Sequence, residues 1–312
     1  MEPPDLPPPP PPSADAPLAG TAPRKRSGLS VVVAILVAVS ATVAAVFIAT
    51  RGGGDGLRFR FAVGDVHLYD LSILDETDPF PENPEGGRFT ANGTFQTRVT
   101  EAIGASATME VSISELELGF ADQTFPQEMN GRQALHVGTD GRQQELVVGA
   151  TDEAGVLAYL LDPVYPALSG GDVSPGDSWL LEMTVRLAQG EGDTAYEGRG
   201  VFLRFEKLEG VRAAVVRNSL TYRYEETIDA SALAEVSTGG PSTAEGTLHA
   251  SGNGSYTITA WIDPASGTLL KAVGTNDYDI TSRYEGYPAE LTFGTDEIHV
   301  TGTSTVTLTL RT

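Results

Sequence analysis

Histidine is the side chain best suited to acid–base chemistry near neutral pH, and the chain holds four: His67, His136, His249 and His299. No two of them lie at the spacing of metal ligands, and each lies in a stretch that alternates like a β-strand. The chain has no cysteine and lacks the G-x-S-x-G, H-E-x-x-H and phosphate-loop motifs. The sequence therefore predicts no catalytic residues, no metal site and no cofactor, and we expect a protein that is not an enzyme. Clustering of His67, His136 or His249 with carboxylates in one cleft would favour an enzyme instead.

A second group of potential ligands lies in an acidic loop at residues 74–87. Its carboxylates are Asp75, Glu76, Asp78, Glu82 and Glu85. Oxygen ligands on a loop suit Ca²⁺. The loop also contains three prolines and lacks the spacing of an EF-hand, so we interpret it as solvated rather than as a calcium site.

Four aromatic residues indicate a binding surface. Tyr159, Tyr165, Trp179 and Trp261 accompany an apolar helix predicted at 152–161 and strands that we expect to curve. A curved sheet that closes over a helix can leave an apolar groove for a lipid-like ligand, and we predict that these four residues line it. The alternative is that they belong to an ordinary filled core.

A predicted transmembrane helix at residues 29–49 determines where the rest of the chain is expected to lie relative to the membrane. This segment holds no charge, Pro or Gly, and as a helix it would extend about 31 Å, the thickness of a bilayer's hydrocarbon core. Arg24, Lys25 and Arg26 precede it, so the positive-inside rule predicts a cytoplasmic N-terminus and an extracytoplasmic domain after the span. A cleaved signal peptide is the competing interpretation.

Three further segments complete the predicted organisation. Residues 1–28 form a proline-rich cytoplasmic tail that we expect to be disordered, and residues 50–56 form a glycine-rich linker. Residues 57–312 are predicted to be an extracytoplasmic β-rich domain, because Gly and Thr are frequent and apolar residues alternate. The formal charge of −22 opposes long-range attraction to nucleic acid and to anionic lipid, so we expect no nucleic-acid partner.

Alternation predicts individual elements of this domain. Long strands are expected at 88–102 and 106–120, with a β-bulge at Ser114-Glu115 where the apolar phase jumps. Thr139-Asp140-Gly141 predicts a hairpin turn. Besides the helix at 152–161, a second short helix is predicted at 228–236.

Two segments of the domain resemble each other. Residues 61–72 and 173–184 both contain Gly-Asp followed by an alternating strand, at Gly64-Asp65 and Gly176-Asp177. This similarity indicates either two related halves, at about 57–170 and 171–312, or two strands that obey the same turn chemistry.

A resemblance to known proteins is carried by the Gly-Asp strand starts, the long strands at 88–120 and 196–224, and the segment 261–271. The chain resembles bacterial envelope half-barrel proteins, namely the LolA-like carriers and related actinobacterial lipoproteins. The resemblance implies a strongly curved antiparallel sheet around one or two short helices, often with an apolar cavity. The chain departs from that group by lacking the lipidated cysteine and carrying a membrane span instead, which argues against a shuttling role.

The sequence thus predicts a single-pass protein of the cell membrane whose extracytoplasmic half-barrel binds a lipid-like or amphipathic envelope ligand. The alternative is an interaction module that recognises an envelope protein or a cell-wall partner by its surface.

Overall fold

The computed structural model describes residues 57–81, 83–120, 123–127, 132–147, 166–186, 191–229, 245–286 and 295–312. The tail, the predicted span and the linker lie outside these ranges, as do the predicted helix at 152–161 and its Tyr159, and Tyr165. The described residues contain strands and no helix. Within the same ranges, no helix has the length and apolarity needed to cross a membrane.

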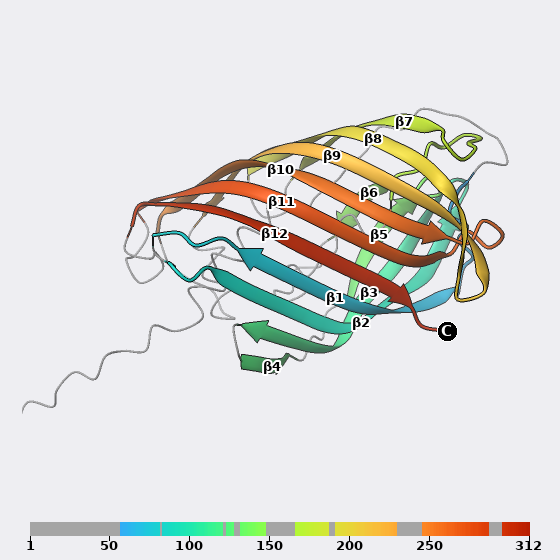
Figure 1. The fold of residues 1–312 in the computed structure, drawn as a ribbon, viewed down its shortest axis with the longest axis horizontal. Helices are drawn as coiled ribbons and strands as arrows, with labels where there is room; N and C mark the ends of the chain where they lie inside the picture. Colours follow the sequence, from blue (N-terminus) through green and yellow to red (C-terminus); the bar gives the residue numbers. More distant parts are fainter. Residues whose placement is uncertain are drawn as a thin grey trace, which may run out of the picture.

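In the described part of the chain, twelve strands form one antiparallel sheet that curves strongly and stays open (Figure 1). They are β1 (Val66–Thr77), β2 (Gly87–Ile103), β3 (Ser106–Phe120), β4 (Gln123–Gln127), β5 (Arg132–Gly138), β6 (Gln143–Val147), β7 (Ser178–Arg186), β8 (Glu191–Leu208), β9 (Val211–Asp229), β10 (Thr247–Ile262), β11 (Leu269–Glu285) and β12 (Glu297–Leu310). Their order is β6-β5-β3-β2-β1-β12-β11-β10-β9-β8-β7, and β4 pairs with β3. The prediction of a mainly β chain built on an antiparallel sheet is confirmed.

Each strand has one buried face, because successive side chains of a strand point to opposite sides of the sheet. In β10, Tyr256, Ile258, Ala260 and Ile262 are buried, and the residues between them are more exposed. The buried faces of the strands share one apolar cluster, which includes Tyr69, Phe95, Leu248 and Leu308 among many others. We call the buried side of the sheet the inner face and the other side the outer face.

The local predictions for β2, β3 and β5 are confirmed. Pairing of β2 with β3 shifts register between Asn92 and Thr94, and Glu115 has a positive φ of 55°, so the bulge lies where the apolar phase jumps. The turn between β5 and β6 contains Gly141 with φ of 77°, as a hairpin turn of this sequence requires.

One prediction was wrong at its start. The predicted helix at 228–236 begins inside β9, which continues to Asp229. Residues 228 and 229 pair with Leu248 and Thr247 of β10, so ladder hydrogen bonds replace the expected helical ones. The remaining residues of that prediction lie outside the described ranges.

The two Gly-Asp segments form turns with the same hydrogen bonds. Gly64 and Asp65 bond reciprocally to Val99 of β2, and Gly176 and Asp177 bond in the same way to Phe202 of β8. The Asp65 carboxylate accepts from the Ala62 backbone N–H, as Asp177 does from Ser174. The two glycines have φ of 95° and 100°, a conformation that L side chains rarely adopt. The similarity seen in the sequence therefore extends to the geometry of the two turns.

Candidate functional site

A row of tyrosines and glycines crosses the inner face from β9 to β12. In register, Tyr222 pairs with Gly254, Gly254 with Tyr278, and Tyr278 with Gly302. A Cβ built on Gly254 would overlap the Tyr222 hydroxyl, and one on Gly302 would overlap the Tyr278 hydroxyl. The tyrosine rings therefore lie across the neighbouring glycines. This packing gives a smooth aromatic surface and carries the phenol groups toward the centre of the sheet.

The phenol of Tyr278 ends at a buried carboxyl group. Its hydroxyl donates to Asp75 of β1 at 3.1 Å, and the Thr77 hydroxyl donates to the same carboxyl oxygen at 3.4 Å. Asp75 is fully buried. Burial raises the pKa of Asp75 to about 7, against the opposing effect of the Tyr278 and Thr77 hydrogen bonds. The Asp75 side chain is therefore a carboxyl group that can either donate or accept a hydrogen bond near neutral pH.

This group, which we call the Asp75 cluster, joins residues about two hundred positions apart in the chain. Two more polar residues continue it on the inner face, because Ser304 of β12 pairs with Asp75 and with Asn276 of β11. Both are buried. Sequence reasoning missed the cluster because it placed Asp75 in a solvated loop. The signal was available, since Asp75 continues the inward phase of Tyr69, Leu71 and Ile73 in the same strand.

A second inner-face carboxyl group lies near the far end of β9. The Tyr224 hydroxyl donates to the Glu226 carboxyl at 2.7 Å, and both side chains are buried. Burial raises the pKa of Glu226, and the Tyr224 hydrogen bond opposes this shift. The inner face therefore combines an apolar surface with two buried acids, each held by a tyrosine.

The two tryptophans that were predicted to line an apolar groove lie on opposite faces of the sheet. Trp179 is on the inner side, where its ring packs on Gly200 and its Nε1 donates to the Ala167 carbonyl at 3.2 Å. Trp261 stands between buried Ala260 and Ile262, so it points to the outer face, where its Nε1 donates to Glu206. The structure therefore does not bring Trp179 and Trp261 to one surface.

The Ala167 carbonyl beside Trp179 also accepts from the Nδ2 atom of Asn218 at 3.1 Å. Asn218 is 2% exposed, and its Oδ1 has no hydrogen-bond partner among the described residues. A buried amide oxygen of this kind leaves one acceptor on the inner face beside the aromatic ring of Trp179.

The four histidines do not assemble into a centre. His67 lies against Tyr69, and burial lowers the His67 pKa. His136 contacts Thr108, His249 contacts Thr227, and His299 contacts Asp279. In the part of the chain that the structure describes, no three His, Asp or Glu side chains are grouped as metal ligands.

The carboxylates of the predicted acidic loop at 74–87 also lie apart from one another. Asp75 is buried in the inner face, whereas the Asp78 carboxylate accepts from the Thr301 hydroxyl at 2.7 Å on the exposed side. Glu82 lies outside the described ranges. The carboxylates of this segment that are described therefore do not converge on one point.

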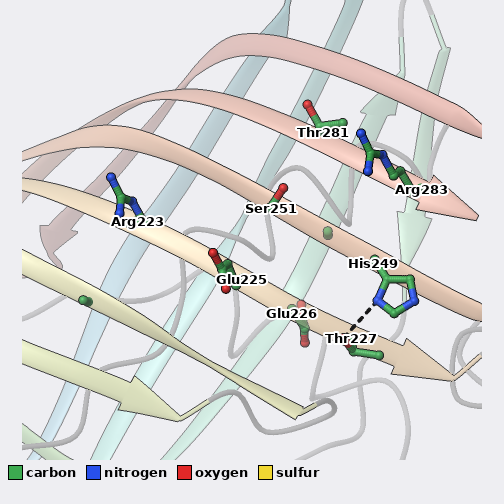
Figure 2. Close-up of a pocket in the computed structure, with 10 residues that line it drawn as sticks. Arg223, Glu225, Glu226, Thr227, His249, Ser251, Thr281 and Arg283 are labelled. Atoms are coloured by element: carbon green, nitrogen blue, oxygen red, sulfur yellow. Dashed lines mark hydrogen bonds between the residues drawn. The ribbon is translucent and has the colours of Figure 1, made fainter.

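A polar groove of about 740 Å³ lies over β8 to β11. Figure 2 shows its lining: Arg223, Glu225, Glu226 and Thr227 from β9, His249 and Ser251 from β10, and Thr281 and Arg283 from β11. By strand alternation all of these except the buried Glu226 lie on the outer face. Two guanidinium groups, two carboxyl groups, an imidazole and three hydroxyls can bind a polar ligand here, and the volume is within the range of small-molecule sites.

Comparisons with known proteins leave the family of the chain open. No protein-family model matches, and no curated protein matches. Among solved structures, the chain is similar to OmpT, an outer membrane protein of Vibrio cholerae in its trimer form, with 10% identity, 80% of this chain and 100% of that chain covered, and a TM-score of 0.17. A likeness at this level carries no argument about fold or function.

Proposed function

We propose that the chain is a membrane-anchored extracytoplasmic binding protein whose inner sheet face holds a lipid-like or amphipathic ligand, in the manner of a half-barrel. The observation that supports this proposal is the inner face itself. Its apolar cluster runs from β1 to β12 on one curved sheet whose ends do not pair with each other among the described strands. A surface of this shape can enclose a hydrocarbon chain along its length.

The Asp75 cluster supplies a polar partner for such a ligand. A carboxyl group with a pKa of about 7 can hydrogen-bond to an ester, an amide or a hydroxyl without carrying a full buried charge. The Tyr222 and Tyr278 rings beside it are buried at 4% and 3% exposure, so the proposal requires a ligand to displace the groups that cover them before it contacts the rings. The ligand would therefore place its apolar chain along the inner face and its polar end at Asp75.

A photoreactive fatty acid tests this proposal in the full chain. Bacteria that express the protein are fed a diazirine fatty acid and irradiated, and the crosslinked residues are identified by mass spectrometry. We expect crosslinks at inner-face positions such as Tyr222 and Tyr278, and none at their outer-face neighbours Arg223 and Asp277. Crosslinks confined to residues 29–49 would contradict the proposal.

The outer groove supports a second candidate function, the recognition of a cell-wall or protein partner by surface. Its polar lining, which mixes guanidinium, carboxyl and hydroxyl groups, suits a saccharide rather than an acyl chain. The test is co-sedimentation of the full chain with isolated cell wall. Replacing both arginines, Arg223→Gln and Arg283→Gln, should abolish sedimentation, whereas Arg199→Gln on the same face should leave it unchanged.

A further inference from the structure

One end of the sheet carries the turns 62–65, 103–106, 174–177, 208–211 and 263–268. They lie at the same end because the strands that they begin or terminate are antiparallel neighbours in continuous register. The C-terminal strand also ends there, where Figure 1 marks the chain terminus. We call this the turn end.

Every large hydrophobic residue that is exposed among the described residues lies at the turn end. These residues are Val63, Val66, Leu68, Ile103, Leu180, Phe205 and Val211. Val63 and Ile103 are each 66% exposed; Val63 lies in the first Gly-Asp turn, and Ile103 is the last residue of β2 at the β2–β3 turn. Phe205 and Val211 flank the β8–β9 turn, which lies beside the second Gly-Asp turn at Gly176-Asp177. Scattered exposed hydrophobics are ordinary, but their confinement to one end of the sheet indicates a contact surface.

Cations accompany these apolar residues. Arg60, Arg98, Arg204, Lys207 and Arg212 are exposed at the turn end. Lys207 and Arg212 pair directly across the β8–β9 hairpin, and the Arg212 guanidinium lies 3.6 Å above the Phe205 ring. Like charges in register repel each other, so this pairing has a cost that an anionic partner would relieve.

Several carboxylates at the turn end are hydrogen-bonded within the protein. Asp65, Asp177 and Asp263 accept hydrogen bonds from backbone N–H groups of their own turns. Glu101 and Glu209 are also exposed there, and Glu206 forms an ion pair with Arg204. The cations are therefore offset in part by acids, and the apolar turn tips stand between them.

The opposite end of the sheet has the reverse character. Its strand termini carry exposed Asp78, Glu85, Asp229, Glu245, Glu285, Asp296 and Glu297, with Arg88 and Arg283 among them. The domain is consequently polarised along its strands, although its net charge is strongly negative. Long-range repulsion from an anionic surface follows the net charge, whereas orientation at short range follows this polarity.

The chain enters the described domain at the turn end. Phe59 donates its backbone N–H to Thr139, and the Arg60 side chain donates to the Ala265 carbonyl, so residues 59 and 60 are fixed against the turns of this end. The predicted span ends at residue 49, and a linker of a few residues leaves the turn end within reach of the bilayer.

We propose that the turn end docks on the anionic lipid surface of the membrane that anchors the chain, with Val63, Ile103 and Val211 entering the interface and Lys207 and Arg212 binding headgroups. Exposed apolar tips, cations beside them, the acidic far end and the entry point of the chain all select lipid as the occupant. This inference rests on the membrane anchoring in the proposed function, goes beyond the proposed ligand binding and does not depend on that binding.

Because the chain has no cysteine, a single introduced cysteine can be labelled uniquely. Full-length Val211→Cys and Glu245→Cys proteins carry an environment-sensitive dye and are reconstituted into vesicles of phosphatidylglycerol and phosphatidylcholine in equal parts, with brominated lipid as quencher. We expect roughly twofold or greater quenching at position 211 relative to position 245, with a blue shift at 211 only. Quenching at position 211 no greater than at position 245 would overturn the proposal.

Two changes test the assignment to anionic lipid. The charge reversal Lys207→Glu with Arg212→Glu should remove most of the quenching at position 211. If that variant folds poorly, raising the salt on the unmodified pair to about 1 M, where the Debye length is about 3 Å, should have the same effect. Quenching that persists in pure phosphatidylcholine and at high salt would overturn the role of anionic lipid.

Discussion

The two faces of the same strands place different demands on their residues. In β10, Ile258 is 2% exposed on the inner face, and its neighbours Thr257 and Thr259 are partly exposed on the outer face. Polar groups differ in the same way: inner Asp75 and Glu226 are bonded to tyrosines, whereas outer Arg283 forms an exposed ion pair with Glu297 and outer His299 is hydrogen-bonded to exposed Asp279. The inner face therefore contributes most of the apolar burial that stabilises the fold, and it contains the groups whose pKa values are strongly shifted. The outer face is available for recognition.

Truncating an inner residue should give the largest difference between the faces. Ile258→Ala is expected to lower the free energy of unfolding by about 2–5 kcal/mol, because it removes buried methyl groups from a packed core. Thr259→Ala, one position away on the outer face, should cost about 1 kcal/mol or less. Urea unfolding of the full chain, followed by tryptophan fluorescence, measures both. Equal losses would contradict the assignment of the faces.

The pH dependence of stability should come from the inner acids. The folded-state pKa of Asp75, about 7, lies above the unfolded value near 4, so the folded state binds more protons between these values. Stability should therefore fall as pH rises through this window, by about 1.4 kcal/mol per pH unit, and level off above it. The raised pKa of Glu226 acts in the same direction.

The variant Asp75→Asn tests this pH dependence, because it keeps a similar shape and cannot titrate. It should flatten the slope, whereas Thr259→Ala should keep it. Stability that rises with pH in the unmodified chain across this window would contradict a raised pKa at Asp75.

Removing one hydroxyl from each face should give a smaller difference. Tyr278→Phe takes a donor from buried Asp75 and is expected to cost about 1–3 kcal/mol, because the carboxyl group stays out of water with fewer partners. Thr303→Val removes an outer hydroxyl that donates to Asp277, where water can replace it, and should cost about 1 kcal/mol or less. Thermal unfolding of the two variants side by side checks the order of these losses.

The smallest effect is expected at an outer ion pair. Arg283 and Glu297 are 67% and 51% exposed, so Arg283→Ala should change stability by about 0.5 kcal/mol or less. A loss above 2 kcal/mol would show that the outer face contributes to the fold as the inner face does.

Much of the sheet could be predicted because its signals are local. Alternation in 88–102 and 106–120 gave both strands, and the phase jump at Ser114-Glu115 gave the bulge. The Gly-Asp repeats likewise identified two turns that share their hydrogen bonds. These features depend on side-chain period and on backbone conformations that few residues adopt.

The Asp75 cluster could not be predicted in the same way, since it depends on strand order. Asp75 meets Tyr278 because β12 lies between β1 and β11, and no local pattern states that pairing. The partition of Trp179 and Trp261 between the faces was accessible, because Trp261 alternates with Ala260 and Ile262. The two tryptophans were predicted to share a groove on the basis of residue type, without regard to that alternation.

The central claim is that the inner face carries a lipid-like ligand, and one measurement tests it most directly. A protease site placed in the predicted linker at 50–56 of the full chain would allow the domain to be released from washed membranes without detergent and examined by native mass spectrometry. We predict a mass above that of the polypeptide, with the excess lost on denaturation and identified as lipid. A folded domain that shows only the polypeptide mass would contradict the claim.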